Sequence, residues 1–314
     1  MQFADAAAVA AALTPAALVE ALWEGFRQGC EMPVRHHHTM QVPGEAAATL
    51  LLMPAWIEGG FVGVKVVSVF PGNADRGQPS IYGSYLLSSG KTGELLAVMD
   101  GPELTSRRTA ASSALAADYL ARKDAATLLV VGTGRLSAHM ARAHAAVRPL
   151  TRVLIWGRNP EKAAATVAEL ADLGVTVEVA PASLEAAVGQ ADIISCVTLS
   201  TQPLIQGAWL RPGQHLDLVG GFTPAMREAD DEAVRRARVY VDTRAGATKE
   251  GGDIVQPLAS GALTADGIHG DLYDLCRGTA AGRGSDQEIT FFKSVGCALE
   301  DLMAAVQVYR VLSA

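Results

Sequence analysis

The pattern of apolar and polar positions changes near residue 125 and predicts a different architecture on each side. Residues 1–30 carry apolar positions at helical spacing, which predicts one or two amphipathic helices. Residues 61–70, FVGVKVVSVF, are rich in Val and Phe, as expected of a buried strand. The segments IYGSYLL and ELLAVMD, joined by SSGKTG, predict a β-hairpin.

Beyond residue 125, short apolar strands alternate with helical segments around residues 136–148 and 160–173. The strand candidates are TLLVVGTG, RVLIWGR, VTVEVA, ADIISCVT, HLDLVGGF and RVYVDT. Strands that alternate with helices indicate a parallel sheet covered on both faces. After about residue 285, EITFFKSVGCALEDLMAAVQVYRVL predicts a long terminal helix that returns to the first domain. We therefore expect an α/β protein whose domains comprise residues 1–120 plus 290–314, and 121–289.

The first strand of the alternating region ends in a glycine-rich turn. Gly132, Gly134 and Ser137 occupy the GxGxx(G/A) positions between a strand and a helix. Two glycines there allow a tight turn and the close approach of a pyrophosphate to the helix N-terminus. Dinucleotide binding is the favoured interpretation, and an ordinary glycine-rich turn is the alternative.

The second strand of this region lacks the acidic residue that usually binds the ribose of NAD. Gly157, Arg158 and Asn159 follow the strand, and Lys162 lies nearby. An Arg pairs with a 2′-phosphate, whereas a carboxylate would repel it. We expect NADPH as the cofactor, with NADH as a further possibility; the alternative is that Arg158 points to solvent.

Two adjacent arginines, Arg107 and Arg108, stand where a helix is expected to begin at the N-cap residue Thr105. Cations are unfavourable at a helix N-terminus unless an anion lies close by. The position of the arginines therefore suggests an anion site and, with the adjoining dinucleotide motif, a small carboxylate as substrate.

Lys65 lies in the middle of an apolar strand, on the same face as Phe61, Gly63, Val67 and Val69. A lysine is rarely buried on such a face without a partner. It either extends to solvent at an edge, or faces a pocket where it binds an anion or transfers a proton. Arg35 is a third cation near a strand start and is uninformative by itself.

Composition excludes several classes of function. Apolar residues make up 49% and charged residues 19% of the 314 residues, and the net charge of −7 does not favour nucleic-acid binding. No apolar run reaches the length of a membrane span, and the N-terminus lacks the basic region of a signal peptide. Four scattered cysteines suggest free thiols in the cytoplasm. The run His36–His38 lacks acidic or Cys partners at useful spacing, so no metal site is expected.

Several segments together resemble the ornithine cyclodeaminase/mu-crystallin family: GVKVVSVFPGN, TGELLAVMDGPELTSRRTAASSALAADYLAR, GTG with His139 behind it, VDTR…EGGDI and EITFFKSVGCALEDL. The resemblance implies a Rossmann domain inserted into a second α/β domain that binds substrate and forms a homodimer. It also implies that Arg35, Lys65 and Arg108 bind the carboxylate of an imino acid. The expected cofactor-binding residues are Thr109, Gly132, Thr133, Gly134, Arg135, Leu136, Arg158, Asn159, Val197 and Thr198.

One position departs from the cyclodeaminases and the related alanine dehydrogenases, which carry an Asp just after the strand HLDLVGG. Phe222 stands there in this chain, so a proton-transferring acid is missing. The segment GGFTPAMREAD resembles the family's reductase branch, which acts on cyclic imines. We expect reduction of Δ1-pyrroline-2-carboxylate to L-proline, and of Δ1-piperideine-2-carboxylate to L-pipecolate, with Lys65 or a held water as proton donor.

Two alternatives stay open. The first is another amino-acid oxidoreductase of the family, in which Asp217 or Asp253 would replace the missing acid. The second is a cofactor-dependent binding protein like mu-crystallin; three cations around one ligand disfavour it.

Overall fold

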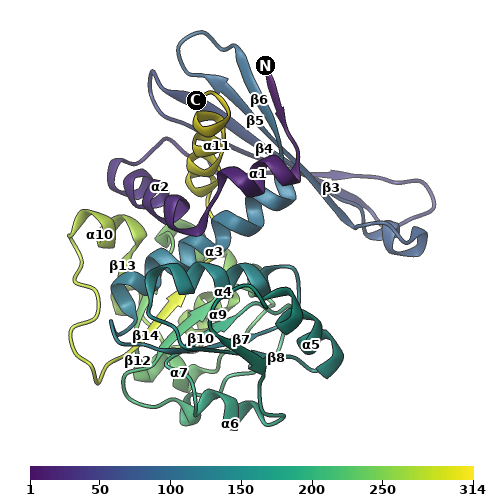
Figure 1. Cartoon of the computed structure of the whole chain (residues 1–314). Coiled ribbons are helices and arrows are strands. Elements are labelled where there is room, and N and C mark those ends of the chain that lie inside the picture. Colours follow the sequence, from purple (N-terminus) through teal and green to yellow (C-terminus); the bar gives the residue numbers. More distant parts are fainter. The chain divides into compact units, whose positions relative to one another are not determined.

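The computed structural model describes residues 1–73 and 75–314, which form two compact units. The first comprises Met1–Thr109 and Ala298–Ala314, and the second, Ala110–Cys297, is inserted between those two parts (Figure 1). The boundaries differ from those expected at residues 120/121 and 289/290. One boundary falls inside the helix α3 (Gly101–Leu120), whose later half bonds with the second unit, for example through Ser113.

The first unit is built on a sheet with the strand order β1-β6-β5-β4-β3-β2. Strands β2 to β6 pair antiparallel with their neighbours, which confirms the hairpin predicted for β5 and β6, while β1 pairs parallel with β6. Its elements are β1 (Gln2–Ala4), α1 (Ala6–Ala12), α2 (Pro15–Gln28), β2 (His36–Met40), β3 (Ala48–Trp56), β4 (Phe61–Val69), the 3-10 turn η1 (Pro71–Arg76), β5 (Ile81–Ser89), β6 (Leu95–Asp100) and α11 (Ala298–Leu312).

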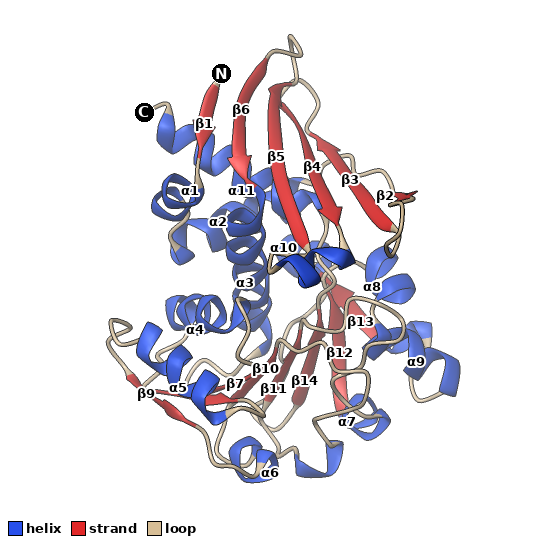
Figure 2. Ribbon diagram, turned by 90° about the vertical axis from the view of Figure 1, so that its right-hand side faces the viewer, coloured by secondary structure: helices blue, strands red, loops and turns tan.

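The two faces of this sheet have different surroundings. Helices α1, α2 and α11 pack on one face (Figure 2), which contains the buried side chains of Lys65, Tyr85 and Met99. The opposite face carries a row of half-buried apolar side chains: Leu52, Pro54, Val64, Val66, Leu86 and Val98. Among the described residues, no helix of the same unit covers this second row.

The helix α3 begins at Gly101, five residues earlier than expected from an N-cap at Thr105. Asp100 Oδ1 accepts the backbone N–H of Glu103 at 2.8 Å and so satisfies the start of the helix, and Pro102 suits its first turn. Arg107 and Arg108 therefore do not lie at the helix N-terminus. The anion site was inferred from an unfavourable interaction of these arginines with the helix dipole, and that inference was wrong. Arg108 nevertheless takes part in a buried cluster described below.

The second unit is a parallel sheet with the order β13-β12-β14-β11-β10-β7-β8-β9, which confirms the predicted Rossmann-type architecture. Figure 1 shows α4 on one side of this sheet and α6 and α7 on the other. The elements are β7 (Thr127–Val131), α4 (Leu136–Val147), β8 (Arg152–Trp156), α5 (Pro160–Glu169), β9 (Thr176–Val179), α6 (Leu184–Val188), β10 (Ile193–Cys196), η2 (Gly207–Trp209), β11 (His215–Leu218), α7 (Asp231–Arg236), β12 (Ala237–Val241), α8 (Arg244–Glu250), α9 (Gly252–Ser260), η3 (Ala265–Gly267), β13 (Ile268–Asp271), α10 (Leu272–Arg277) and β14 (Ile289–Lys293).

Two segments predicted to be helical contain strands. Residues 1–30 include β1, and the segment predicted as one terminal helix contains β14 followed, after a turn, by α11. All five residues of β14 are buried. A strand buried on both faces lacks polar alternation, so its apolar run resembles that of a buried helix.

Among the described residues, no single helix is long and apolar enough to cross a membrane. Helices α1 and α2 meet that criterion only as a pair bent by 77° at the break between them. In the first unit, α2 buries Leu18, Leu22 and Phe26 and contacts α11.

Candidate active site

A cavity of about 800 Å³ lies at the carboxyl ends of β7, β8 and β10 in the second unit. The loops that follow these strands supply most of its lining. In an open parallel sheet this edge is where ligands bind. The lining residues are Gly132, Thr133, Gly134, Trp156, Gly157, Arg158, Asn159, Lys162, Val197, Thr198, Leu199, Ser200, Thr201, Gln202 and Leu204.

The glycine-rich turn has the backbone that the motif predicts. Gly132 has a φ of +131°, and a Cβ there would lie 2.9 Å from Val197 atoms, so both conformation and space require glycine. Ser137, in the third motif position, is buried, and its hydroxyl donates to the carbonyl of Gly132 at 2.9 Å. The small serine therefore ties α4 to the turn without blocking the pocket, and the turn suits a dinucleotide.

The end of β8 gives the pocket a positive rim. Gly157 stands where an acid would usually bind the ribose, and a Cβ there would lie 2.5 Å from the Thr133 methyl group. Arg158 and Lys162 both line the cavity. Asn159 caps α5, since its Oδ1 accepts the backbone N–H of Glu161 at 2.8 Å.

Three expected cofactor residues are not among those that line this cavity. Arg135 is the N-cap residue of α4, and neither it nor Leu136 is among the described residues that line the cavity. Thr109 belongs to the first unit, where it is buried. The sequence analysis did not single out the lining residues Trp156, Leu199 to Gln202, and Leu204. These residues lie at or after the carboxyl ends of predicted strands, where parallel sheets bind ligands, and that position could have identified them.

A second constellation, buried in the first unit, joins Lys65 and Arg108. The ammonium of Lys65 forms an ion pair with Asp301, at 2.8 Å from its Oδ2. Arg108 Nε donates to Asp301 Oδ1 at 2.8 Å, and another guanidinium nitrogen of Arg108 donates to Glu300. Lys65 and Arg108 are 4% and 5% exposed. Asp301 thus binds both cations, and Lys65 does not extend to solvent at an edge.

Burial and the neighbouring charges shift the pKa values of this cluster. Burial lowers the pKa of Lys65 to about 8, although the charge of Asp301 opposes this; the positive charges of Arg108 and Arg35 lower it further. Arg35 therefore lies within electrostatic reach of Lys65. Burial alone would raise the pKa of Asp301, but Arg108 and Lys65 hold it below its usual value. Lys65 and Arg108 are thus balanced by Glu300 and Asp301, and the charge of Arg35 acts on this cluster from outside it.

The two proposed substitutes for the missing acid serve internal roles. Asp217 is buried and accepts hydrogen bonds from Ser195 at 2.6 Å and Ser113 at 2.9 Å. Asp253 is 1% exposed and accepts the backbone N–H of Glu228 at 2.7 Å. Phe222, in contrast, is 47% exposed just beyond β11.

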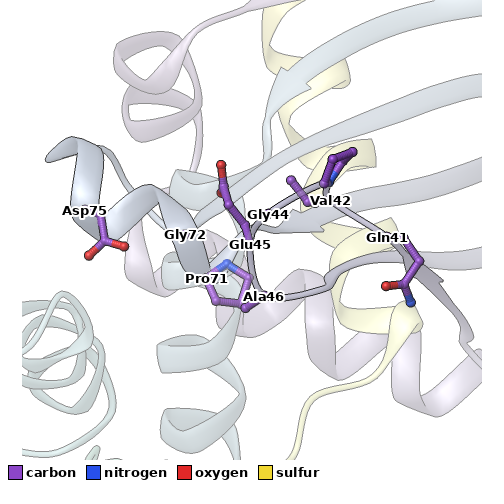
Figure 3. Close-up of a pocket in the computed structure, with 9 residues that line it drawn as sticks. Gln41, Val42, Gly44, Glu45, Ala46, Pro71, Gly72 and Asp75 are labelled. Carbon is purple, nitrogen blue, oxygen red and sulfur yellow. The ribbon is translucent and has the colours of Figure 1, made fainter.

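Another cavity, of about 730 Å³, lies in the first unit between residues 41–46 and η1 (Figure 3). The described residues that line it include Glu45 and Asp75 but no Lys or Arg. Glu45 pairs with Arg76, and the described lining itself offers no cation that would bind a carboxylate. Elsewhere, His36 and His38 share one side of β2, with ring centroids 6.2 Å apart, and no group of three or more potential metal ligands occurs among the described residues.

Comparison with known proteins shows what this architecture is similar to. The sequence profile of the ornithine cyclodeaminase/mu-crystallin family matches residues 1–314. A Δ1-pyrroline-2-carboxylate reductase of Paracoccus denitrificans is 44% identical over 292 residues, which cover 92% of each chain. The Thermococcus litoralis enzyme of the same name, solved with NADH and L-proline, has 32% identity and a TM-score of 0.90, covering 99% of this chain and 97% of that one. An archaeal alanine dehydrogenase dimer with bound NAD has 30% identity and a TM-score of 0.88, covering 99% and 96%.

Proposed function

The chain belongs to the ornithine cyclodeaminase/mu-crystallin family, and on that premise we propose that it reduces Δ1-pyrroline-2-carboxylate to L-proline with a nicotinamide cofactor. Relatives that bear the name of this reductase are 36–44% identical to the chain. The observation that carries the proposal is the buried cluster in which Lys65 and Arg108 lie together, held by the carboxylates of Glu300 and Asp301. Such a cluster suits a carboxylate whose ring already contains an imine.

Each unit supplies a different part of the reaction. In the first, Arg35, Lys65 and Arg108 fix the carboxylate, which removes rotational freedom from the substrate before reaction. Lys65, with a pKa of about 8, is protonated at neutral pH and suits the delivery of a proton to the imine nitrogen. The nicotinamide, when bound, supplies the hydride. In the second unit, Gly132 and the loops around it bind the dinucleotide.

Purified protein tests the proposal directly. With NADPH and Δ1-pyrroline-2-carboxylate, cofactor absorbance should fall while L-proline accumulates in equal amount, as measured by chiral amino-acid analysis. Δ1-Piperideine-2-carboxylate should give L-pipecolate in the same assay. Cofactor binding without loss of absorbance with either imine would refute the reductase and favour a binding protein.

For the cofactor, we propose a preference for NADPH, supported by Arg158 and Lys162 at the rim and by Gly157 in place of an acid. Arg158→Asp should reverse the NADPH/NADH ratio of kcat/KM by roughly tenfold or more, since a carboxylate repels the 2′-phosphate (about 1.4 kcal/mol for each tenfold). Steady-state kinetics with both cofactors measure this. Arg152→Asp, at the far end of the same strand, is the control; an unchanged ratio in Arg158→Asp would exclude Arg158 from the site.

For the substrate, Arg108→Ala should lower kcat/KM for the imine at least tenfold, because a charge-assisted pair contributes roughly 1.5–3 kcal/mol. The variant should also lose stability, because Glu300 and Asp301 would be left buried without this cation. NADPH titration and thermal unfolding separate the two effects. Arg107→Ala is the matched control, since Arg107 pairs with Glu103 outside the cluster. Normal kinetics in Arg108→Ala would remove Arg108 from substrate binding.

We propose that the chain forms a homodimer through the apolar sheet face defined by Leu52, Pro54, Val64, Val66, Leu86 and Val98. A contiguous apolar face of this kind is typical of an interface. Val64→Glu should convert the dimer to a monomer in analytical ultracentrifugation, whereas Thr92→Glu, on the exposed β5–β6 turn, should not. A Val64→Glu protein that stays dimeric would place the interface elsewhere.

We propose a cytoplasmic location, because free thiols suit a reducing compartment. The four cysteines that form no disulfide are Cys30, Cys196, Cys276 and Cys297.

A further inference from the structure

Three ionisable side chains are buried together in the second unit, at the same edge of the sheet as the cofactor cavity. Glu228 lies in the segment after β11, Asp253 in the first turn of α9, and Lys293 at the carboxyl end of β14. Their exposed fractions are 0%, 1% and 0%. The Lys293 ammonium lies 3.1 Å from Asp253 Oδ2. Burial of three such groups costs free energy unless ion pairs and hydrogen bonds compensate for their lost hydration.

The Glu228 carboxylate binds the loop that lines the cofactor cavity. Its Oε1 accepts the backbone N–H of Thr198 at 2.7 Å and the hydroxyl of the same residue at 2.8 Å. Its Oε2 accepts the backbone N–H of Gly220 at 2.8 Å. Thr198 lines the cavity, and Gly220 follows the neighbouring strand β11. One carboxylate therefore joins the ends of β10 and β11 beside the cofactor.

Asp253 and Lys293 hold this carboxylate in turn. Asp253 Oδ1 accepts the backbone N–H groups of Glu228 at 2.7 Å and Ala229 at 3.1 Å. This fixes the backbone from which the Glu228 side chain extends. The positive charge of Lys293 favours the ionised form of Glu228, whereas that of Asp253 opposes it. The sequence analysis considered Asp253 only as a substitute acid and did not single out Glu228 or Lys293.

The Glu228 contacts require a carboxylate. Two of its three partners are backbone N–H groups, which can only donate, so a protonated carboxyl would lose an acceptor and gain a poorly placed donor. Burial raises the pKa of Glu228 to about 7; Asp253 adds to this, while Lys293 and the Thr198 hydrogen bonds oppose it. The remaining titratable group that faces Glu228 is the Cys196 thiol of β10, whose pKa burial holds well above its usual value.

We propose that Glu228 is a positioning residue for the cofactor, whose carboxylate fixes Thr198 and the loop at residues 197–202 while Lys293 favours its charged form. This rests on the proposed cofactor role of the cavity, but not on the identity of the substrate. The group is a carboxylate with a raised pKa, so its contribution is present above that pKa and is lost as the pH falls through about 7. Cofactor affinity should therefore fall from pH 8 to pH 6.

The test uses the whole protein and NADH as the probe, because the 2′-phosphate of NADPH itself titrates near this range. Binding is followed by quenching of tryptophan fluorescence, since Trp156 lines the cavity. In the unmodified protein, Kd should rise severalfold between pH 8 and pH 6. Glu228→Gln keeps the shape but sets an amide N–H₂ against backbone donors. Its Kd at pH 8 should be roughly tenfold higher and nearly independent of pH.

Two further variants keep the proposal open to refutation if Glu228→Gln folds poorly. Thr198→Val removes one hydrogen bond to the carboxylate, so the rise in Kd should begin at a higher pH. Glu232→Gln, an exposed carboxyl on α7, should leave the whole curve unchanged. A wild-type Kd that is flat between pH 6 and pH 8, or a Thr198→Val curve that matches wild type, would overturn the proposal. Normal NADH binding without imine reduction would instead refute the reductase.

Discussion

Replacing Lys65 by Met is expected to lower kcat/KM for Δ1-pyrroline-2-carboxylate by ~10²–10⁴-fold, the range for loss of a positioned acid. Lys65 is buried against Asp301, and Met has a similar length but neither charge nor proton. The loss should exceed that of Arg108→Ala, because Lys65 is proposed to hold the carboxylate and to supply the proton. NADPH affinity should be retained, since the glycine-rich turn belongs to the other unit.

The pH profile distinguishes a proton donor from a simple cation. A lysine whose pKa is lowered to about 8 is protonated below that pH and neutral above it, so kcat/KM should fall as the pH rises through about 8. This fall should be absent from the residual activity of Lys65→Met. Lys91→Met, on the exposed β5–β6 turn, should behave as wild type. An unchanged alkaline limb in Lys65→Met would assign the proton to a held water and leave Lys65 as a carboxylate ligand.

The second large effect concerns the choice of reaction. Ornithine with NAD⁺ should yield proline at least ~10²-fold more slowly than the preformed cyclic imine is reduced, because cyclodeamination needs a positioned acid–base group that Phe222 cannot provide. Asp217 and Asp253 do not replace it, since both are buried and engaged in internal hydrogen bonds. Amino-acid analysis of timed reactions measures both rates in the same preparation.

Phe222→Asp provides the complementary experiment. It places a carboxyl at the exposed position beyond β11, where the cyclodeaminases carry theirs. Any gain of ornithine turnover should appear in this variant, while Phe222→Leu should leave the preference for the imine unchanged. Efficient ornithine turnover by the unmodified protein would contradict the assignment and favour a cyclodeaminase.

The sequence predicted those features that depend on local spacing. The β4 strand, the β5–β6 hairpin and the glycine-rich turn all follow from patterns within about ten residues. The third motif position, Ser137, is buried against the turn, as its small size predicts. Where the local pattern was ambiguous, as in the short, fully buried β14, the predicted helix was wrong.

The partners of the cations could not be found in this way. Glu300 and Asp301 lie in the first turn of a helix, where acidic residues are common for reasons of the helix dipole alone. Nothing in the spacing connects residue 301 with residues 65 and 108, because only the tertiary fold brings them together. The same holds for Glu228, whose neighbours Asp253 and Lys293 come from separate segments.

The placement of β14 between β11 and β12 has a consequence for how the chain reaches its native state. During synthesis from the N-terminus, β11 and β12 emerge long before the strand that separates them, so each presents an unpaired edge to solvent in the meantime. The first unit is completed later still, because α11 follows β14 in the chain. The second unit is therefore complete only after β14 has emerged, and the first unit only after α11. Refolding from denaturant should be slow and prone to aggregation, and premature termination near residue 285 should leave both units incomplete rather than release a folded cofactor-binding fragment.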